Sequence, residues 1–174
     1  TTLIAKQTIC RTEESIDGLL EDLLTPAERV RVISFVNAHA VMRSTRDPDF
    51  RDALHGCDVL LRDGVGMALL MQRVGRSPGH NMNGTDLIPQ LLERTPRTKK
   101  LALFGTREPR LGLAAAQLRE MGFENIVTTD GFRPDEDYVD LARTEAPDLI
   151  ILAMGMPKQE RVALQLSRDR DISG

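Results

Sequence analysis

The sequence predicts an α/β fold: a Rossmann-like, mostly parallel sheet with helices on both faces. Short apolar runs alternate with stretches of helical periodicity along the whole chain. The runs Leu101 to Phe104 and Leu149 to Ala153 are entirely apolar, as is typical of central strands covered on both faces. Several runs end in glycine or polar residues, which is where open α/β sheets bind their ligands.

In the first half of the chain, β-branched and apolar runs predict strands at residues 8–10, 31–36 and 57–61. A helix follows Thr12, which suits an N-cap, and it ends before Pro26. A segment from Ala40 to about Arg46 is helical, and Asp47-Pro48 begins a further helix that ends near His55. Two more helices are expected at residues 65–74 and 87–94, the second capped by Thr85-Asp86.

The second half continues the alternation. Strands are expected at residues 99–104, 124–129 and 148–154, and helices at residues 109–121, 135–145 and 157–168. Between the two halves lies a polar loop rich in glycine and asparagine, residues 75–84. Loops of this kind carry function more often than regular elements do.

Length and composition limit the classes of protein to consider. With 174 residues, 41% of them hydrophobic and 28% charged, we expect one packed domain over residues 1–174. A net charge of -3, no tryptophan and one tyrosine argue against nucleic-acid binding. Cys10 and Cys57 lack metal-binding spacing and suit a reducing cytoplasm. No apolar run is long enough to span a membrane, and the first residues do not resemble a signal peptide.

The stretch Asp63-Gly64-Val65-Gly66 is the strongest candidate for chemistry. Asp63 follows a predicted strand, so its carboxylate belongs at the ligand-binding edge, where it could serve as a general base. It could equally be the N-cap of the helix that begins near Val65. Asn37 presents the same choice, since it could bond to the backbone of its own turn. We expect His39 to be an ordinary residue of a helix start.

No metal site is predicted. Asp47-Pro48-Asp49 has the Asp-x-Asp spacing of many metal-dependent sugar-nucleotide enzymes, but a helix start explains it better. The same holds for Asp169-Arg170-Asp171 in a polar tail. Gly105-Thr106-Arg107 is similar to a phosphate-binding turn, although it lacks the full dinucleotide fingerprint. No nucleophile elbow or Ser/His/Asp order is present.

Four motifs, taken in order, resemble the WecG/TagA/CpsF family of bacterial glycosyltransferases (glycosyltransferase family 26). They are Asn37-Ala38-His39, Asp63-Gly64-Val65-Gly66, Asn83-Gly84-Thr85-Asp86-Leu87 and Gly155-Met156-Pro157-Lys158-Gln159-Glu160. The segment Leu101 to Gly105 and Gly131-Phe132 also match. The likeness covers about residues 6 to 168. The pair formed by the Asp-Gly-Val-Gly motif at Asp63 and the Gly-x-Pro-Lys-Gln-Glu motif at Gly155 is specific to the family.

The resemblance implies an inverting transferase that moves a sugar from a UDP-sugar to a lipid-diphosphate-linked sugar in cell-envelope polysaccharide synthesis. Family donors include UDP-N-acetylmannosamine, its uronic acid and UDP-glucose. Asp63 matches the proposed catalytic base. Substrate-binding roles carry over to Asn37, Gly64, Asn81, Asn83, Gly84, Thr85, Asp86, Gly105, Phe132, Gly155, Pro157, Lys158, Gln159 and Glu160. The likeness implies no cofactor, and it leaves a homo-oligomer open.

This chain departs from the family pattern in two ways. Many relatives have an arginine shortly before Gly-Thr-Asp, where this chain has Asn81, and the Asn81-to-Gly84 version looks more like the branch that transfers glucose. Relatives also continue for several tens of residues after the last helix. We therefore expect a core that lacks the family's membrane-associated C-terminal tail, and whose 174-residue form is partly or wholly inactive. The resemblance places the enzyme in the cytoplasm, peripherally at the inner face of the cytoplasmic membrane.

A second class of function stays open on sequence grounds. A non-catalytic nucleotide-binding or regulatory domain could use the same fold, because a fold alone does not fix a function. Asp63 distinguishes the two classes, since a binding module has no need of a carboxylate at the ligand-binding edge.

Overall fold

The computed structural model describes residues 2–172, which form two compact units. The first unit contains residues 2–26 and 31–94, and the second contains residues 27–30 and 95–172. Both units combine helices with a parallel sheet, which confirms the Rossmann-like α/β class. The strands form two sheets, one in each unit, whereas we expected one sheet. Alternation of strands and helices cannot distinguish these arrangements. The expectation of a single domain stays a prediction.

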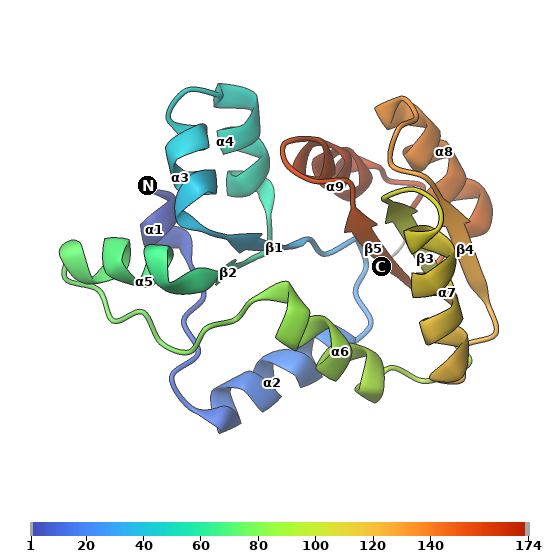
Figure 1. The fold of residues 1–174 in the computed structure, drawn as a ribbon, viewed down its shortest axis with the longest axis horizontal. Coiled ribbons are helices and arrows are strands. Elements are labelled where there is room, and N and C mark those ends of the chain that lie inside the picture. The colour runs from blue at the N-terminus through green and yellow to red at the C-terminus, as the bar shows by residue number, and fades with distance from the viewer. Residues whose placement is uncertain (1, 173–174) are drawn as a thin grey trace. The chain divides into compact units, whose positions relative to one another are not determined.

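The first unit is built around two parallel strands, with Ile33 opposite Val59 and Val36 opposite Arg62. Its elements, seen in Figure 1, are α1 (Leu3–Lys6), α2 (Glu13–Leu24), β1 (Ile33–Val36), α3 (Ala38–Ser44), α4 (Pro48–Gly56), β2 (Val59–Arg62), α5 (Gly64–Arg73) and α6 (Gly84–Arg94).

Local sequence explains where two of these helices begin. The Thr12 side chain accepts the Ser15 N–H, and the Ser15 hydroxyl oxygen accepts the Thr12 N–H, so α2 starts with a reciprocal capping box. The Asp47 carboxylate accepts the Phe50 N–H at 3.0 Å, with Pro48 at the first position of α4. Both caps were predicted from sequence, and both are confirmed.

Two predicted details in the first unit are wrong. Thr8–Cys10 forms no strand, because its pairing with β2 is limited to one hydrogen bond from the Thr8 N–H to the Leu60 carbonyl (2.9 Å). Thr85 and Asp86 do not cap α6 but lie inside it. The capping oxygen comes from Asn83, whose side chain accepts the Asp86 N–H at 3.0 Å.

The second unit has a three-stranded parallel sheet in the order β4-β3-β5, so the central strand is β3 (Figure 1). Its elements are β3 (Leu101–Gly105), α7 (Arg110–Glu120), β4 (Ile126–Thr129), α8 (Asp135–Glu145), β5 (Leu149–Ala153) and α9 (Lys158–Arg168). Each lies within about two residues of its predicted position, and α8 has the predicted bounds.

Helices cover both faces of this sheet. Ala102 and Phe104 of β3 pack with α8 and α9, and the Phe104 and Tyr138 rings lie 5.7 Å apart between centroids. Leu101 and Leu103 alternate with them and point to the opposite face, where α7 contacts β3 and β4. Burial on both faces explains why β3 is apolar throughout.

The helices are short: α2 has 12 residues, and α6 to α9 have 11 each. Among residues 2–172, no helix has both the length and the apolar character needed to cross a membrane.

Candidate functional site

The carboxyl ends of β1 and β2 place Asn37 and Asp63 next to each other. Val36 and Arg62 are register partners, and each candidate follows one of them directly. The Asp63 N–H donates to the Val36 carbonyl at 2.9 Å, which extends the ladder by one step. Two positions that are 26 residues apart in sequence are thus brought to one edge.

Asp63 stands at the N-cap position of α5 but does not act as a cap. Its side chain makes no capping hydrogen bond, although its backbone has the extended conformation of an N-cap residue. The side chain is half-buried. An aspartate at this position normally bonds to the backbone of the helix that it precedes. The carboxylate is therefore not committed to the local role that sequence alone made equally plausible.

Asn37 behaves differently. Its side-chain oxygen accepts the Ala40 N–H at 2.9 Å, so it caps α3. The interpretation in which the Asn37 side chain bonds to the backbone of its own turn is therefore confirmed. A ligand-binding role for its side chain stays a prediction, and it would have to operate alongside the cap.

Arg62, which sequence reasoning missed, organises the backbone around Asp63. Its side chain is buried, with 7% of the residue exposed. The guanidinium donates to the carbonyls of Pro78 (3.0 Å), Gly64 (3.0 Å) and Gly79 (3.1 Å). The pKa of the guanidinium lies below its ordinary value, because burial lowers it by more than the neighbouring Asp63 carboxylate raises it. Arg62 thus joins the polar loop to the start of α5.

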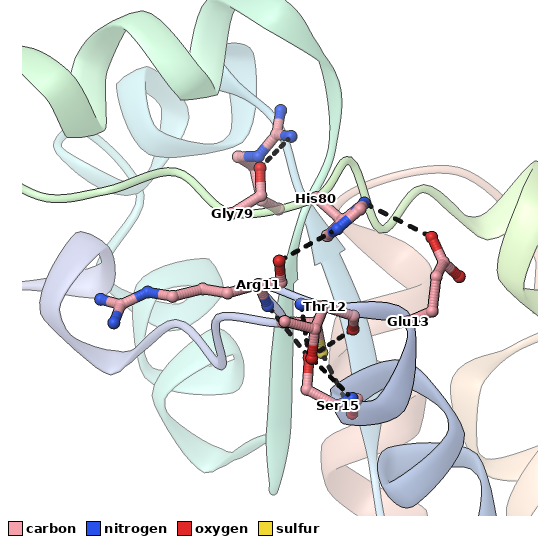
Figure 2. Close-up of polar contacts among 8 residues, drawn as sticks. Arg11, Thr12, Glu13, Ser15, Gly79 and His80 are labelled. Atoms are coloured by element: carbon pink, nitrogen blue, oxygen red, sulfur yellow. Dashed lines mark hydrogen bonds and ion pairs between the residues drawn. The ribbon is translucent and has the colours of Figure 1, made fainter.

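The polar loop is also tied to the segment before α2, as Figure 2 shows. The backbone N–H of His80 donates to the Cys10 carbonyl at 2.7 Å. The Nε2 atom of the His80 ring lies 3.2 Å from the Arg11 carbonyl oxygen. Its Nδ1 lies 3.9 Å from a carboxylate oxygen of Glu13. An open hollow of about 370 Å³ lies here, lined by Arg11, Ser77, Pro78, Gly79 and His80.

The loop brings its asparagines close to the Asp63 motif. Asn81 accepts the Gly64 N–H at 2.7 Å through its side-chain oxygen. Asn83 is engaged by Asp86, to which its amide donates at 2.7 Å. Gly84 lies against the Phe35 ring, where a Cβ would be 3.2 Å from a ring carbon, and Thr85 is exposed. The first unit therefore holds Asn37, Asp63, Gly64, Asn81, Asn83, Gly84, Thr85 and Asp86.

The second unit contains a cavity of about 490 Å³ at the carboxyl edge of its own sheet, within the usual size range of small-molecule sites. Segments that follow all three strands line it: Thr106, Arg107, Glu108, Pro109 and Arg110 after β3, Gly131 and Phe132 after β4, and Ala153, Met154 and Gly155 at the end of β5. Gly105, Phe132 and Pro157, to which the family resemblance assigns substrate-binding roles, lie at or after the ends of the three strands of this sheet. The structure brings the first two together with Gly155, while Pro157 does not line the cavity.

A close-packed turn forms one wall of the cavity. Gly105 has φ +147°, and a Cβ there would overlap the backbone of Ala153. Thr106 also has a positive φ, +50°; its N–H donates to the Ala153 carbonyl at 2.9 Å, and its own carbonyl accepts the Gly131 N–H at 3.0 Å. These bonds join the ends of β3 and β5 to the loop after β4.

Lys158 and Gln159 serve the structure of this edge. The Lys158 ammonium donates to the carbonyls of Gly131 (2.9 Å) and Arg133 and lies 3.4 Å from the Tyr138 hydroxyl oxygen, so it holds the loop that carries Phe132. Gln159 accepts the Gly155 N–H at 3.1 Å and donates to the buried Glu160 carboxylate at 3.0 Å. Substrate-binding roles for these side chains stay predictions.

Residues 2–172 contain no group of three or more His, Cys, Asp or Glu side chains placed to hold a metal ion. The carboxylate of Asp47 caps α4, and its second oxygen pairs with Arg43 at 3.2 Å. The helix-start interpretation of Asp47-Pro48-Asp49 is therefore confirmed.

Comparison with known proteins adds two findings. The family described as "Glycosyl transferase WecG/TagA/CpsF family" matches residues 7–171. The chain is also 26% identical, over 136 residues, to the N-acetylglucosaminyldiphosphoundecaprenol N-acetyl-beta-D-mannosaminyltransferase of Bacillus subtilis (strain 168). That alignment covers 75% of this chain and 52% of the relative, so the chain spans about half the length of the curated relative it matches.

Proposed function

The chain belongs to the WecG/TagA/CpsF glycosyltransferase family, and from this we propose that it transfers a sugar from a UDP-sugar to a lipid-diphosphate-linked sugar, with inversion at the anomeric carbon. The observation that carries the proposal is the Asp63 carboxylate, which lies at the carboxyl edge of β1 and β2 and makes no capping bond. The relative's printed name, which specifies a mannosaminyltransferase acting on a diphosphoundecaprenol-linked sugar, supports the acceptor class.

Asp63 is the proposed general base. Inversion is a single displacement, in which the acceptor hydroxyl oxygen bonds to the anomeric carbon as the bond to the UDP oxygen breaks. The hydroxyl proton passes to the Asp63 carboxylate as its oxygen attacks. Asn81, through its bond to the Gly64 N–H, and Arg62, through the Gly64 carbonyl, position the backbone next to this carboxylate.

The cavity of the second unit is the proposed site for UDP. A leaving diphosphate develops charge that the protein must stabilise. Two arginines line this cavity, and cationic donors of that kind can supply the stabilisation without a metal ion. We therefore propose that transfer needs no divalent cation, and that it takes place at the inner face of the cytoplasmic membrane, where a lipid-linked acceptor resides.

The donor sugar is proposed as N-acetylmannosamine, its uronic acid or glucose. The relative's name favours the first, whereas Asn81, at the position where many family members have arginine, favours glucose. A transfer assay with each UDP-sugar and a polyprenyl-diphosphate-linked N-acetylglucosamine acceptor would decide between them. Transfer from one donor, retained in excess chelator, is the expected result. Loss of transfer in chelator with recovery on adding Mg²⁺ or Mn²⁺ would contradict the metal-independent mechanism.

A non-catalytic nucleotide-binding domain is the alternative. It predicts that UDP binds and that no donor is either transferred or hydrolysed. Calorimetry with UDP and ADP tests the nucleotide site separately from the chemistry, and equal or absent binding of both would count against a uridine-specific site.

A further inference from the structure

Two arginines face the cavity of the second unit without a carboxylate partner. Arg107 and Arg110 both line the cavity, and neither forms an ion pair within residues 2–172. By contrast, Arg161 in the same unit pairs with Asp135 at 3.0 Å. Glu108 also lines the cavity, but one of its carboxylate oxygens accepts the Gly112 N–H at 3.1 Å in the first turn of α7. Glu108 keeps its negative charge, but the two arginines outnumber it, so the charged side chains that line the cavity are net positive.

Arg107 rests on an aromatic ring. Its guanidinium carbon lies 4.3 Å from the centroid of Phe132, a side chain that is exposed, with 63% of the residue accessible to solvent. A cation–π contact at an exposed site is weaker than a charge-assisted, bidentate hydrogen bond from a guanidinium to a phosphate. A ligand that carries phosphate oxygens could therefore displace this contact.

The backbone before Arg107 is fixed, so that a movement would be confined to the side chain. Thr106 is bonded through both its N–H and its carbonyl, to Ala153 and Gly131 respectively. Gly131 directly precedes Phe132, so the same bonds hold the backbone next to the ring in place. The two side chains thus extend into one cavity from backbone positions that are tied together.

From these contacts we propose that Arg107 is the diphosphate-binding arm of this cavity. In the free protein its guanidinium rests on Phe132, and on binding a nucleoside diphosphate it leaves the ring and donates two hydrogen bonds to the diphosphate oxygens. The inference rests on the proposed function, because that function supplies UDP as the ligand. It goes further in assigning the diphosphate contact to one side chain of the Gly105-Thr106-Arg107 turn, which sequence alone identified only as similar to a phosphate-binding turn.

Calorimetry with UDP, UMP and uridine tests the assignment. Arg107→Gln is compared with wild type and with Arg119→Gln, a matched control that removes an exposed arginine from the last turn of α7, away from the cavity. Arg107→Gln should weaken UDP binding roughly ten- to a hundredfold, the usual effect of losing a charge-assisted hydrogen bond. Uridine binding should change by less than about twofold, and Arg119→Gln should bind all three ligands as wild type does.

Other results would overturn the assignment in distinguishable ways. If Arg107→Gln bound UDP as tightly as wild type, the arginine would not contact the diphosphate. If it weakened UDP and uridine equally, the arginine would only support the nucleoside or the loop. If wild type bound neither UDP nor uridine, the proposed donor site itself would fail, and the inference with it.

The movement of the side chain has its own readout. In the free protein, the Nε–Hε resonance of Arg107 should show an upfield ring-current shift, which Phe132→Leu removes. Loss of the resonance in Arg107→Gln assigns it. UDP should abolish the upfield shift, and uridine should leave it in place. A shift that persists in the UDP complex would show that the guanidinium stays on the ring, which contradicts the proposal.

Discussion

Replacing Asp63 with asparagine separates catalysis from stability. The substitution keeps the size of the side chain and removes its ability to accept a proton. Loss of a general base typically slows turnover by about 10²–10⁴-fold, which is about 3–5 kcal/mol of activation free energy. The structural cost should be small, because Asp63 makes no capping bond. The substitution removes the interaction of the charge with the α5 dipole, about 0.3–1 kcal/mol, and its attraction to the neighbouring Arg62 guanidinium.

The two magnitudes decide how an inactive variant is interpreted. A domain of ordinary stability, about 5–15 kcal/mol, stays more than 99% folded after losing about 1 kcal/mol. Unfolding therefore cannot produce a hundredfold loss of turnover. The assay is the rate of transfer from the UDP-sugar under saturating donor, together with calorimetric binding of UDP, which should change little.

A matched pair of variants tests the structural side of the argument. Asp47→Ala removes a real cap, the bond to the Phe50 N–H, and should lower the free energy of unfolding by about 1 kcal/mol. Asp63→Ala should cost less. Turnover of Asp63→Asn within a few-fold of wild type would refute the assignment of the base. A collapse of UDP affinity would instead move Asp63 to the donor site.

Three further predictions concern the scaffold. Arg62→Met removes three hydrogen bonds from a buried guanidinium and should lower the free energy of unfolding by about 3 kcal/mol; a loss below about 1 kcal/mol in urea titration would show that the loop does not depend on it. Gly105→Ala forces a Cβ into the backbone of the neighbouring strand and should cost at least about 2 kcal/mol, whereas Gly18→Ala, in open space within α2, should be neutral or stabilise by up to about 1 kcal/mol. Burial raises the pKa of the Asp148 carboxyl, but hydrogen bonds from the Lys99 ammonium and a backbone N–H outweigh it, so the pKa lies below its ordinary value. The resulting stabilisation is present above the unfolded-state pKa of about 3.9 and is lost as pH falls through the folded-state pKa. Asp148→Asn should therefore flatten the dependence of unfolding free energy on pH below about 4, and an unchanged pH profile would contradict this.

Local chemistry made most of the elements predictable. The helix α8 has the predicted bounds because Pro134 precedes it and three acidic residues occupy its first turn, where they favour the helix dipole. The box at Thr12 and the cap at Asp47 depend on residues three positions away, so the sequence contains both partners. Thr8–Cys10 has suitable residues for a strand but lacks a continuous partner, and strand pairing is set by distant segments.

The candidate site was predictable only in part for a similar reason. The sequence predicts that Asn37 and Asp63 follow strands of a parallel sheet, and the structure adds that these two strands are neighbours. The choice between cap and free carboxylate does not follow, because aspartate and asparagine suit both roles, and the structure gives them different ones. The bonds of Arg62 to Pro78 and Gly79 join residues 16 and 17 positions apart through backbone carbonyls, which no side-chain pattern marks.

The same distinction separates two kinds of residue at the cavity of the second unit. Lys158 and Gln159 belong to the motif that identifies the family, and their polar groups bond to neighbouring segments of the protein. Lys158 reaches two carbonyls and the Tyr138 hydroxyl, so binding a ligand through its ammonium would release the loop at Gly131. Arg107 lies outside that motif, in the Gly105-Thr106-Arg107 turn, and its contact with Phe132 is weak and open to solvent. Shape at this edge is therefore set by the motif residues, and the charge available to a ligand is supplied by residues outside it. Differences in ligand preference between family members should accordingly follow positions such as Arg107 and Arg110 more closely than the shared motif.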